Sequence, residues 1–535
     1  MSTYVLSYDV GTTGIKTCLF EIDQTIRMIE WASCGYHLYI LDNGGAEQDA
    51  DEWWDAMCRT TREVFVRAAV TPDQVAGISF CSQMQGLVLV DREGVPVHRP
   101  MSYMDQRAEE EIKKGIANGI QIAGANIFKL IPSLMITGAV SSSVKDPIWR
   151  YKWIEANEPE NLARAYRWLD VKEYMISRCT GRFVMTEDSA WSTLLYDTRK
   201  GHEGWSMKMC RMFGIRTDLL PEIIKSTDEA GRLTAKAASE LGLKEGTPVF
   251  GGGGDATLIG IGAGCVNTGQ THIYSGTSGW VSTIVDKQFI DANYMIAAIV
   301  GAQSGKFNYF AEMETAGKCL EWVKDHLALD EIGIYLDKHD VCEGTENQEK
   351  VYTSLYDYLS EVIDSVEPGA GGVIFTPWLH GNRCPFEDSN AGGMFFNLKL
   401  ETGKTEMIRA VVEGVCYHLR WMLECQDRKI KTSDPIRFCG GGALSDVTAQ
   451  MLSDITGRTI EVVASPQNVG SMGAAAISGV GLGIMNSIEE IADFIPAEKT
   501  FIPDAKRGAL YEKNYKVFKK LHDANKKCFK DMNKM

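Results

Sequence analysis

Residues 4–20 read YVLSYDVGTTGIKTCLF and carry the clearest structural signal in this chain. Two short apolar runs flank a turn of glycine and threonine, a pattern that predicts a β-hairpin. Gly11 and Gly14 allow backbone conformations that bring N–H groups close to a ligand. Asp9 places a carboxylate before the turn and Lys16 places a cation after it, a combination that suits a phosphate chain with its Mg²⁺. An ordinary tight hairpin would show the same glycines, so the turn alone leaves both readings open.

A second unit of the same kind lies in the middle of the chain. Residues 271–284 read THIYSGTSGWVSTI, in which a glycine and threonine turn again separates two apolar runs. Two similar short turns can arise by chance, but each begins one half of the chain. A fold repeated in two halves would place a ligand in the cleft between them. We therefore predict two domains, residues 1–262 and 263–535, packed together with a hinge.

Length, charge and cysteine content narrow the class of protein. A chain of 535 residues is too long for one core. Its net charge of −16, from 55 basic and 71 acidic residues, argues against nucleic acid or an anionic membrane as the partner. The 14 cysteines form no Cys-x-x-Cys pair, which predicts reduced thiols in a cytoplasmic protein without a zinc site. At the C-terminus, the spacing of Tyr511, Tyr515 and Phe518 predicts an amphipathic helix packed on the body.

Two glycine-rich segments carry further chemistry. Asp255 follows four consecutive glycines, so a substrate can approach the bare backbone closely while the carboxylate stands alone. Such a group suits a general base that takes a proton from a hydroxyl, although an aspartate there can also cap the following helix. Residues 440–442 form a glycine turn between a strand and a helix. That turn could let an adenine ring lie against bare backbone or a phosphate lie at the helix N-terminus.

In this order and spacing, the segments resemble the FGGY carbohydrate kinases of the actin/hexokinase-like ATPase superfamily over nearly the entire chain. The matching segments are Asp9–Thr13, the glycine run ending at Asp255, Gly276–Gly279, Gly440–Ala443, residues 150–157, residues 378–383 and residues 393–413. The resemblance implies an α/β fold with two actin-like, ribonuclease-H-like domains. Each domain would have a mixed sheet flanked by helices, with a cleft between the two domains.

The resemblance also implies an ATP- and Mg²⁺-dependent kinase that phosphorylates a primary hydroxyl of a sugar or polyol. Asp255 would be the catalytic base and Asp9 would lie near the metal, with the acceptor on the N-terminal domain and the nucleotide mainly on the C-terminal domain. The implied ATP-binding residues are Thr12, Thr13, Gly14, Lys16, Gly276, Thr277, Gly317, Gly442, Ala443 and Asp446.

The acceptor pocket resembles that of xylulokinases, which makes a ketose such as xylulose the expected substrate. The implied pocket residues are Gln83, Met84, Gln85, Tyr103, Asp105 and Asp255. The chain departs from the family pattern at several positions: Gln85 replaces a histidine, Met104 an asparagine, Ala256 a polar residue after the base, Asn397 a glycine and Arg150 a lysine. A changed set of polar contacts changes which hydroxyls can be satisfied. Glycerol, erythritol, ribulose and gluconate therefore stay open as acceptors. An actin-like ATPase that needs no sugar and a catalytically idle sensor also stay open, and the resemblance allows a homodimer.

Overall fold

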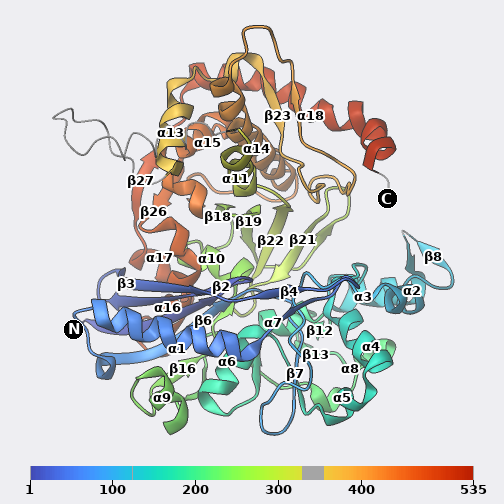
Figure 1. The fold of residues 1–535 in the computed structure, drawn as a ribbon, viewed down its shortest axis with the longest axis vertical. Coiled ribbons are helices and arrows are strands. Elements are labelled where there is room, and N and C mark those ends of the chain that lie inside the picture. The colour runs from blue at the N-terminus through green and yellow to red at the C-terminus, as the bar shows by residue number, and fades with distance from the viewer. Residues whose placement is uncertain (1, 123, 328–354, 534–535) are drawn as a thin grey trace.

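Two mixed β-sheets organise the computed structural model, which describes residues 2–122, 124–327 and 355–533 (Figure 1). The first sheet runs in the order β15 (Glu229–Arg232), β16 (Pro248–Phe250), β6 (Val75–Ser82), β1 (Thr3–Val10), β2 (Gly14–Ile22) and β3 (Ile26–Gly35), with β17 (Gly253–Gly254) also paired to β6. The second sheet runs in the order β20 (Ile290–Asp291), β21 (Ile296–Val300), β22 (Phe307–Met313), β19 (Gly279–Val285), β18 (Thr271–Ser275), β25 (Ile436–Cys439), β26 (Ile460–Val463) and β27 (Ala497–Phe501).

The two sheets repeat one topology around the two predicted hairpins. β1 and β2 form the first hairpin, with Asp9 opposite Lys16, and β18 and β19 form the second, with Ser275 opposite Gly279. In each sheet the first hairpin strand pairs in parallel with a later strand, β6 or β25. The second hairpin strand pairs in antiparallel fashion with β3 or β22. The predicted fold of two α/β domains with mixed sheets is confirmed.

Amphipathic helices cover the sheets. α1 (Ala50–Arg67) packs on β2 and β3 and buries Trp53 and Met57, and the side chain of Asp49 caps its first turn. In the second half, α14 (Lys404–Asp427) packs on β19 and β22 and also contacts α15 (Asp446–Thr456). The predicted C-terminal helix is α18 (Ala505–Asn533), and Tyr511, Tyr515 and Phe518 are buried as expected.

One helix from late in the chain returns to the first sheet. α16 (Val469–Gly481) packs on β1, β2 and β6 and also against α10 (Asp255–Gly262). The two helices approach so closely that a Cβ at Gly473 would lie 2.4 Å from the backbone oxygen of Leu258. A Cβ at Gly262 would lie 1.8 Å from the backbone oxygen of Val469. Glycine is therefore required on both helices, and the contact ties the start of α10 to the first sheet.

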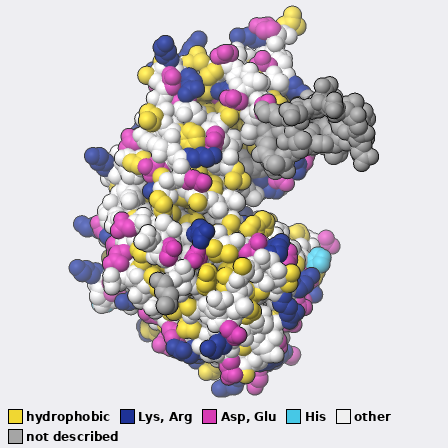
Figure 2. Space-filling model, turned by 90° about the vertical axis from the view of Figure 1, so that its left-hand side faces the viewer, with side chains coloured by type: hydrophobic (Ala, Val, Ile, Leu, Met, Phe, Trp, Pro, Cys, Tyr) yellow, Lys and Arg dark blue, Asp and Glu magenta, His cyan; other side chains and the backbone are white. Residues whose placement is uncertain are grey.

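A deep notch separates the two halves in the space-filling view (Figure 2). The half below the notch contains the first sheet and the half above it contains the second (Figure 1). None of the helices in the described part of the chain combines the length and the apolar character needed to cross a lipid bilayer.

We expect Gly473→Val to destabilise the protein by about 3 kcal/mol, because the added side chain overpacks a backbone-to-backbone contact. Chemical denaturation followed by tryptophan fluorescence measures the change. Gly35→Ala is the matched control, since its Cβ would lie at an ordinary contact distance of 3.5 Å from the backbone oxygen of Thr13. Equal stability of the two variants would show that α10 and α16 are not in tight contact.

Candidate functional site

The turn between β1 and β2 is held from beneath by three side chains. The backbone oxygen of Gly11 accepts hydrogen bonds from the Tyr36 hydroxyl and from Nε2 of Gln83, the latter at 3.1 Å. The backbone oxygen of Thr12 accepts one from Nε2 of Gln48 at 2.7 Å. Because its carbonyl groups are anchored by protein donors, the turn has a fixed shape before any ligand binds.

This turn lines a hollow of about 300 Å³. Lys16 crosses from the hollow to the second half of the chain, where its Nζ donates to Oδ1 of Asn468 at 2.7 Å, one residue before α16. The structure thus gathers six of the residues singled out in the sequence around one cavity: Asp9, Gly11, Thr12, Thr13, Gly14 and Lys16.

The turn between β18 and β19 contacts the N-terminus of α11 (Gly317–His326). The backbone N–H of Gly317 donates to the backbone oxygen of Gly276 at 2.7 Å, and the N–H of Lys318 donates to that of Thr277 at 3.2 Å. A Cβ at Gly317 would lie 2.5 Å from the Gly276 oxygen, so only glycine fits there. Gly276, Thr277 and Gly317, which are far apart in the sequence, form one surface.

The glycine turn after β25 abuts the same hairpin. A Cβ at Gly442 would lie 2.8 Å from the Ser275 hydroxyl oxygen at the end of β18. Ala443 is buried, so only its backbone could face a ligand. Asp446 is exposed, and its carboxylate accepts a hydrogen bond from Nζ of Lys499 at 2.8 Å. The ion pair leaves Asp446 at the rim of the site.

The glycine run before Asp255 threads between other parts of the first half. A Cβ at Gly252 would lie 2.1 Å from the backbone oxygen of Phe80, and one at Gly254 would lie 2.2 Å from Sδ of Met84. These contacts explain the run in steric terms, because no side chain fits along it. The run delivers Asp255 to the first position of α10, where the residue is partly exposed.

The surroundings of Asp255 favour its protonated form. Burial raises the pKa of this carboxyl group to about 7; a hydrogen bond from the Ala256 N–H opposes the shift, and the charges of Asp9 and Glu312 add to it. The Ala256 N–H donates to Oδ1 of Asp255 at 2.7 Å, a contact at the start of α10 that corresponds to the alternative role of a helix cap. Because a carboxylate with a pKa near neutrality accepts and releases protons readily, the geometry suits a general base.

The predicted acceptor residues Gln83, Met84 and Gln85 form part of the loop after β6, and their side chains make different contacts. Gln83 is buried and joins Gly11 to Gln48, so it supports the first turn. Met84 packs on Gly254. Gln85 adopts a left-handed backbone conformation with φ of 63°, which non-glycine residues rarely adopt without support. The loop therefore joins the first turn to the base.

In the segment around Tyr103, one predicted site residue is partly exposed and another lies in the core. Tyr103 is 38% exposed; burial of its hydroxyl raises its pKa, a hydrogen bond with Thr12 opposes the shift, and the charge of Asp255 adds to it. Asp105, in contrast, is fully buried. Its carboxylate accepts from the Ala46 N–H and from Arg107, each at 2.7 Å. In this structure Asp105 positions its own segment and has no surface in the cleft.

Glu312 was absent from the predicted site, and its partner Arg383 ends the segment 378–383 that resembles the family. Glu312 lies on β22 and its charge acts on Asp255. Arg383, which is 60% exposed, donates from Nη1 to Oε2 of Glu312 at 2.8 Å. A carboxylate inside the mostly apolar strand 307–313, in which Asn308 is the other strongly polar residue, is the sequence signal that would have identified Glu312.

The described residues contain no group of three or more His, Cys, Asp or Glu side chains arranged to hold a metal ion. A Mg²⁺ ion that arrives with phosphate keeps most of its water and phosphate ligands and needs only one or two carboxylates. Asp9 fits that need, because its carboxylate has too little positive charge around it. Burial raises the pKa of the group, and the charge of Lys16 and a hydrogen bond with Cys81 offset the rise only in part.

Known proteins match this chain along nearly its full length. Residues 4–262 match the model of the FGGY family of carbohydrate kinases, N-terminal domain, and residues 272–482 match that of the C-terminal domain. A xylulose kinase from Staphylococcus epidermidis is 28% identical over 529 residues, 99% of this chain and 98% of that protein. A gluconokinase from Bacillus licheniformis is 27% identical over 525 residues, 97% of this chain and 95% of that protein.

Solved structures agree on the fold. The crystal structure of a ligand-bound xylulose kinase from Lactobacillus acidophilus has a TM-score of 0.82 and 24% sequence identity, covering 99% of this chain and 100% of that chain. At this identity the likeness establishes the arrangement of the two domains.

The raised pKa of Asp255 has a consequence for stability. The folded state holds a proton on this group more tightly than the unfolded state does, so its contribution to stability is largest at acid pH and declines as pH rises toward about 7. Asp255→Asn, which removes that dependence, should raise the unfolding temperature at pH 8 relative to the wild type. The gain should vanish near pH 4, and a thermal melt series at fixed ionic strength measures it. A gain that grows toward acid pH would contradict the raised pKa.

Proposed function

Because this chain belongs to the FGGY family of carbohydrate kinases, we propose that it transfers the γ-phosphoryl group of ATP to a primary hydroxyl of a ketose such as xylulose. The chain is a carbohydrate kinase; the proposal concerns its acceptor and its residues. The observation that carries the proposal is Asp255, a carboxyl group with a pKa of about 7 at the start of α10.

In the proposed reaction, Asp255 accepts the proton of the acceptor hydroxyl as its oxygen bonds to the γ-phosphorus. The bond between the γ-phosphorus and the bridging oxygen breaks, ADP leaves, and Asp255 releases its proton to solvent. The two glycine turns, 11–14 and 276–279, position the phosphates through backbone N–H groups and hydroxyls. Mg²⁺ held near Asp9 would offset the phosphate charge, and closure of the cleft would exclude water.

The two halves divide the substrates in this proposal. Residues 1–262 bind the acceptor, because the loop after β6 and Tyr103 both belong to them. Residues 263–535 bind the nucleotide, and the mutual contacts of Gly276, Gly317 and Gly442 with the end of β18 support this assignment. Asp446 and Ala443 would bound the adenosine at the rim.

Charge in the cleft favours a neutral acceptor over a sugar acid. Arg383 is one cation that a carboxylate substrate would seek, but Glu312 already pairs with it at 2.8 Å. The charge of Lys145 also acts on Glu312, and that of Glu314 opposes it. Asp255 and Asp146 lie within electrostatic reach of this pair. An added carboxylate would therefore meet net negative charge. The gluconokinase relative keeps gluconate as the alternative acceptor.

A coupled ADP-release assay across xylulose, ribulose, erythritol, glycerol and gluconate tests the proposal. We expect kcat/KM to be highest with a ketopentose and at least about tenfold lower with gluconate, the factor that 1.4 kcal/mol of charge repulsion produces. ADP release at the same rate without any sugar would indicate an ATPase, and no release with any acceptor would indicate a sensor. Either result would overturn the proposal.

The base assignment predicts a pH profile. Since Asp255 acts when deprotonated, kcat/KM for the acceptor should fall below a pKa of about 7 and approach a tenfold loss per pH unit. Above about pH 8 the profile should be level. Initial rates at constant ionic strength with saturating ATP measure how kcat/KM falls on the acid side of the profile. A rate that stays constant down to pH 5.5 would exclude Asp255 as the titrating base.

A further inference from the structure

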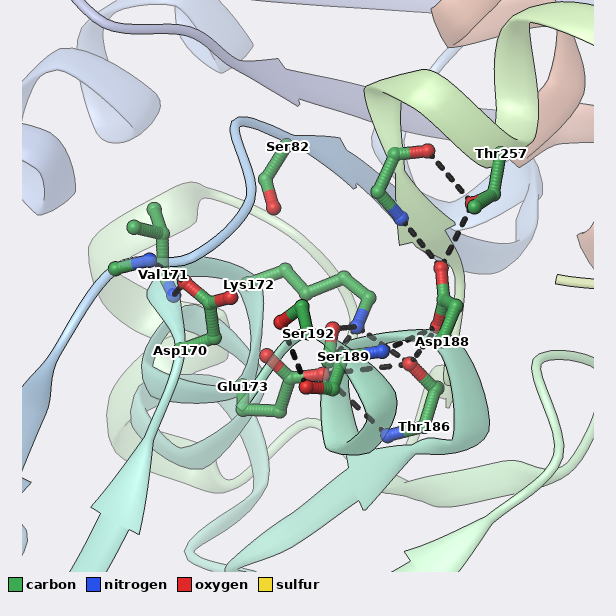
Figure 3. A network of polar contacts seen from close by, with 12 residues as sticks. Ser82, Asp170, Val171, Lys172, Glu173, Thr186, Asp188, Ser189, Ser192 and Thr257 are labelled. Atoms are coloured by element: carbon green, nitrogen blue, oxygen red, sulfur yellow. Dashed lines mark hydrogen bonds and ion pairs between the residues drawn. The ribbon is translucent and has the colours of Figure 1, made fainter. Parts of the chain in front are cut away.

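A buried charged network that includes Asp170, Lys172, Glu173 and Asp188 lies below Ser82 and Thr257 in the view of Figure 3. Its centre is the first turn of α6 (Val171–Thr180), which carries Lys172 and Glu173, both fully buried. Asp170 precedes this turn as its N-cap, and Asp188 comes from the neighbouring α7 (Glu187–Ser192). Lone buried charges are costly in free energy, so a network of this kind in the core needs an explanation.

Asp188 holds the segment that carries the base. Its Oδ2 accepts the backbone N–H of Gly254 at 2.8 Å and the hydroxyl of Thr257 at 2.7 Å. These two donors lie on either side of Asp255 in the sequence. Its Oδ1 accepts the Thr186 hydroxyl at 2.5 Å and the Ser189 N–H at 2.9 Å. With two bonds to each oxygen, the carboxylate fixes the start of α10 against α7.

Asp170 holds the acceptor loop in the same manner. Its Oδ2 accepts the N–H of Gln85 at 2.9 Å, and its Oδ1 accepts the N–H of Gly86 at 2.7 Å and that of Val171 at 2.7 Å. The bond to Gln85 supports the residue whose backbone is in the left-handed region. One carboxylate thus joins the acceptor loop to the first turn of α6.

The charge of Lys172 acts on both aspartates, and its bonds reach Asp188 through Thr186 and Ser189. Its Nζ donates to Glu173, to the Thr186 hydroxyl at 2.6 Å and to the Ser189 hydroxyl at 2.5 Å. Although burial acts to raise the pKa of Asp188, the charge of Lys172 and the bonds to Asp188 hold that pKa below its usual value. The same cation opposes the burial that raises the pKa of Asp170. Lys172 is the cation this network shares among its carboxylates.

We propose that the first turn of α6 is a positioning element of the kinase, which holds the base loop through Asp188 and the acceptor loop through Asp170. The proposal rests on the proposed function. The two loops also touch directly, since Met84 packs on Gly254. A displacement of about 1 Å between reacting groups can cost about 100-fold in rate, so the distance between these loops needs rigid support. The residues act through Asp255 and Gln85, and none of them contacts the proposed reacting atoms.

Loss of the Asp188 contacts with Gly254 and Thr257 should slow the chemical step. Thr257→Val removes one donor to Asp188, and Asp188→Asn turns an amide N–H₂ toward groups that donate. We expect each to lower kcat by about 100-fold while the KM for the acceptor changes by less than about threefold. Thr257→Ser keeps the hydroxyl and should restore kcat to within about threefold of the wild type. A purely structural role would lower the amount of folded enzyme, without recovery of kcat in Thr257→Ser and without a fall in kcat at nearly constant acceptor KM.

Loss of the Asp170 contacts with Gln85 and Gly86 should weaken acceptor binding. Asp170→Asn leaves a backbone N–H of the acceptor loop facing an amide N–H₂. The expected result is an acceptor KM raised about tenfold, the effect of one unpaired buried donor, with the KM for ATP unchanged. An equal rise in both KM values, or none, would contradict this role of Asp170.

Hydrogen–deuterium exchange of the full chain gives a readout that does not require turnover. Exchange in peptides that contain residues 252–258 should accelerate in Asp188→Asn and Thr257→Val. The matched control is Asp197→Asn, which removes a buried carboxylate paired with Arg199 outside the network and should change neither exchange nor kcat. Unchanged exchange together with wild-type kcat in the network variants would overturn the proposal. A wild-type enzyme that turns over no acceptor would instead refute the proposed function, while the exchange result would still decide the positioning role.

Discussion

The close contact between α10 and α16 is the constraint on which the site depends. Only glycines at 262 and 473 permit it, because a Cβ at either position would collide with the opposite backbone. α16 lies on β1, β2 and β6, so the contact fixes the start of α10, and with it Asp255, relative to the end of β1. The residue before α16, Asn468, also accepts a hydrogen bond from Lys16. Backbone packing therefore places Asp255, the proposed base, near the turn between β1 and β2 without any ligand.

Charge is distributed in two layers around that frame. The upper layer faces the cleft and contains Asp255, whose pKa burial and the charges of Asp9 and Glu312 raise to about 7. The lower layer is sealed in the core, where Lys172 is surrounded by hydrogen-bond acceptors and stabilises the charge of Asp188. The buried layer around Lys172 and Asp188 makes the segment rigid, and the cleft-facing layer leaves Asp255 with the proton affinity that a base needs.

The sequence was informative wherever the signal was local. Apolar runs around a glycine turn identified both hairpins, and aromatic spacing identified α18. The sequence was silent where the partners are brought together only by the tertiary fold. Nothing in the segment around Lys172 indicates that Asp188 would lie beside it, because each residue reads as a surface charge on a short helix.

Motif resemblance also cannot tell a residue that faces the cleft from one that holds its own segment. Asp105 matches a family motif, but its carboxylate is enclosed by Arg107 and the Ala46 N–H. Gln83 matches as well, yet its amide supports the carbonyl of Gly11. In each case at least one partner, the Ala46 N–H or the Gly11 carbonyl, lies in a distant segment of the chain, which local spacing does not reveal.

If Asp255 takes the proton from a sugar held opposite ATP, its carboxylate is required for phosphoryl transfer but not for nucleotide binding. Calorimetry of nucleotide binding and sugar-dependent ADP release, each measured in the wild type and in Asp255→Ala, separate these two roles. ADP release in the variant should fall to the background level while the Kd for ATP stays within about threefold of the wild-type value. Sugar-dependent release at the wild-type rate in Asp255→Ala would contradict this role of Asp255.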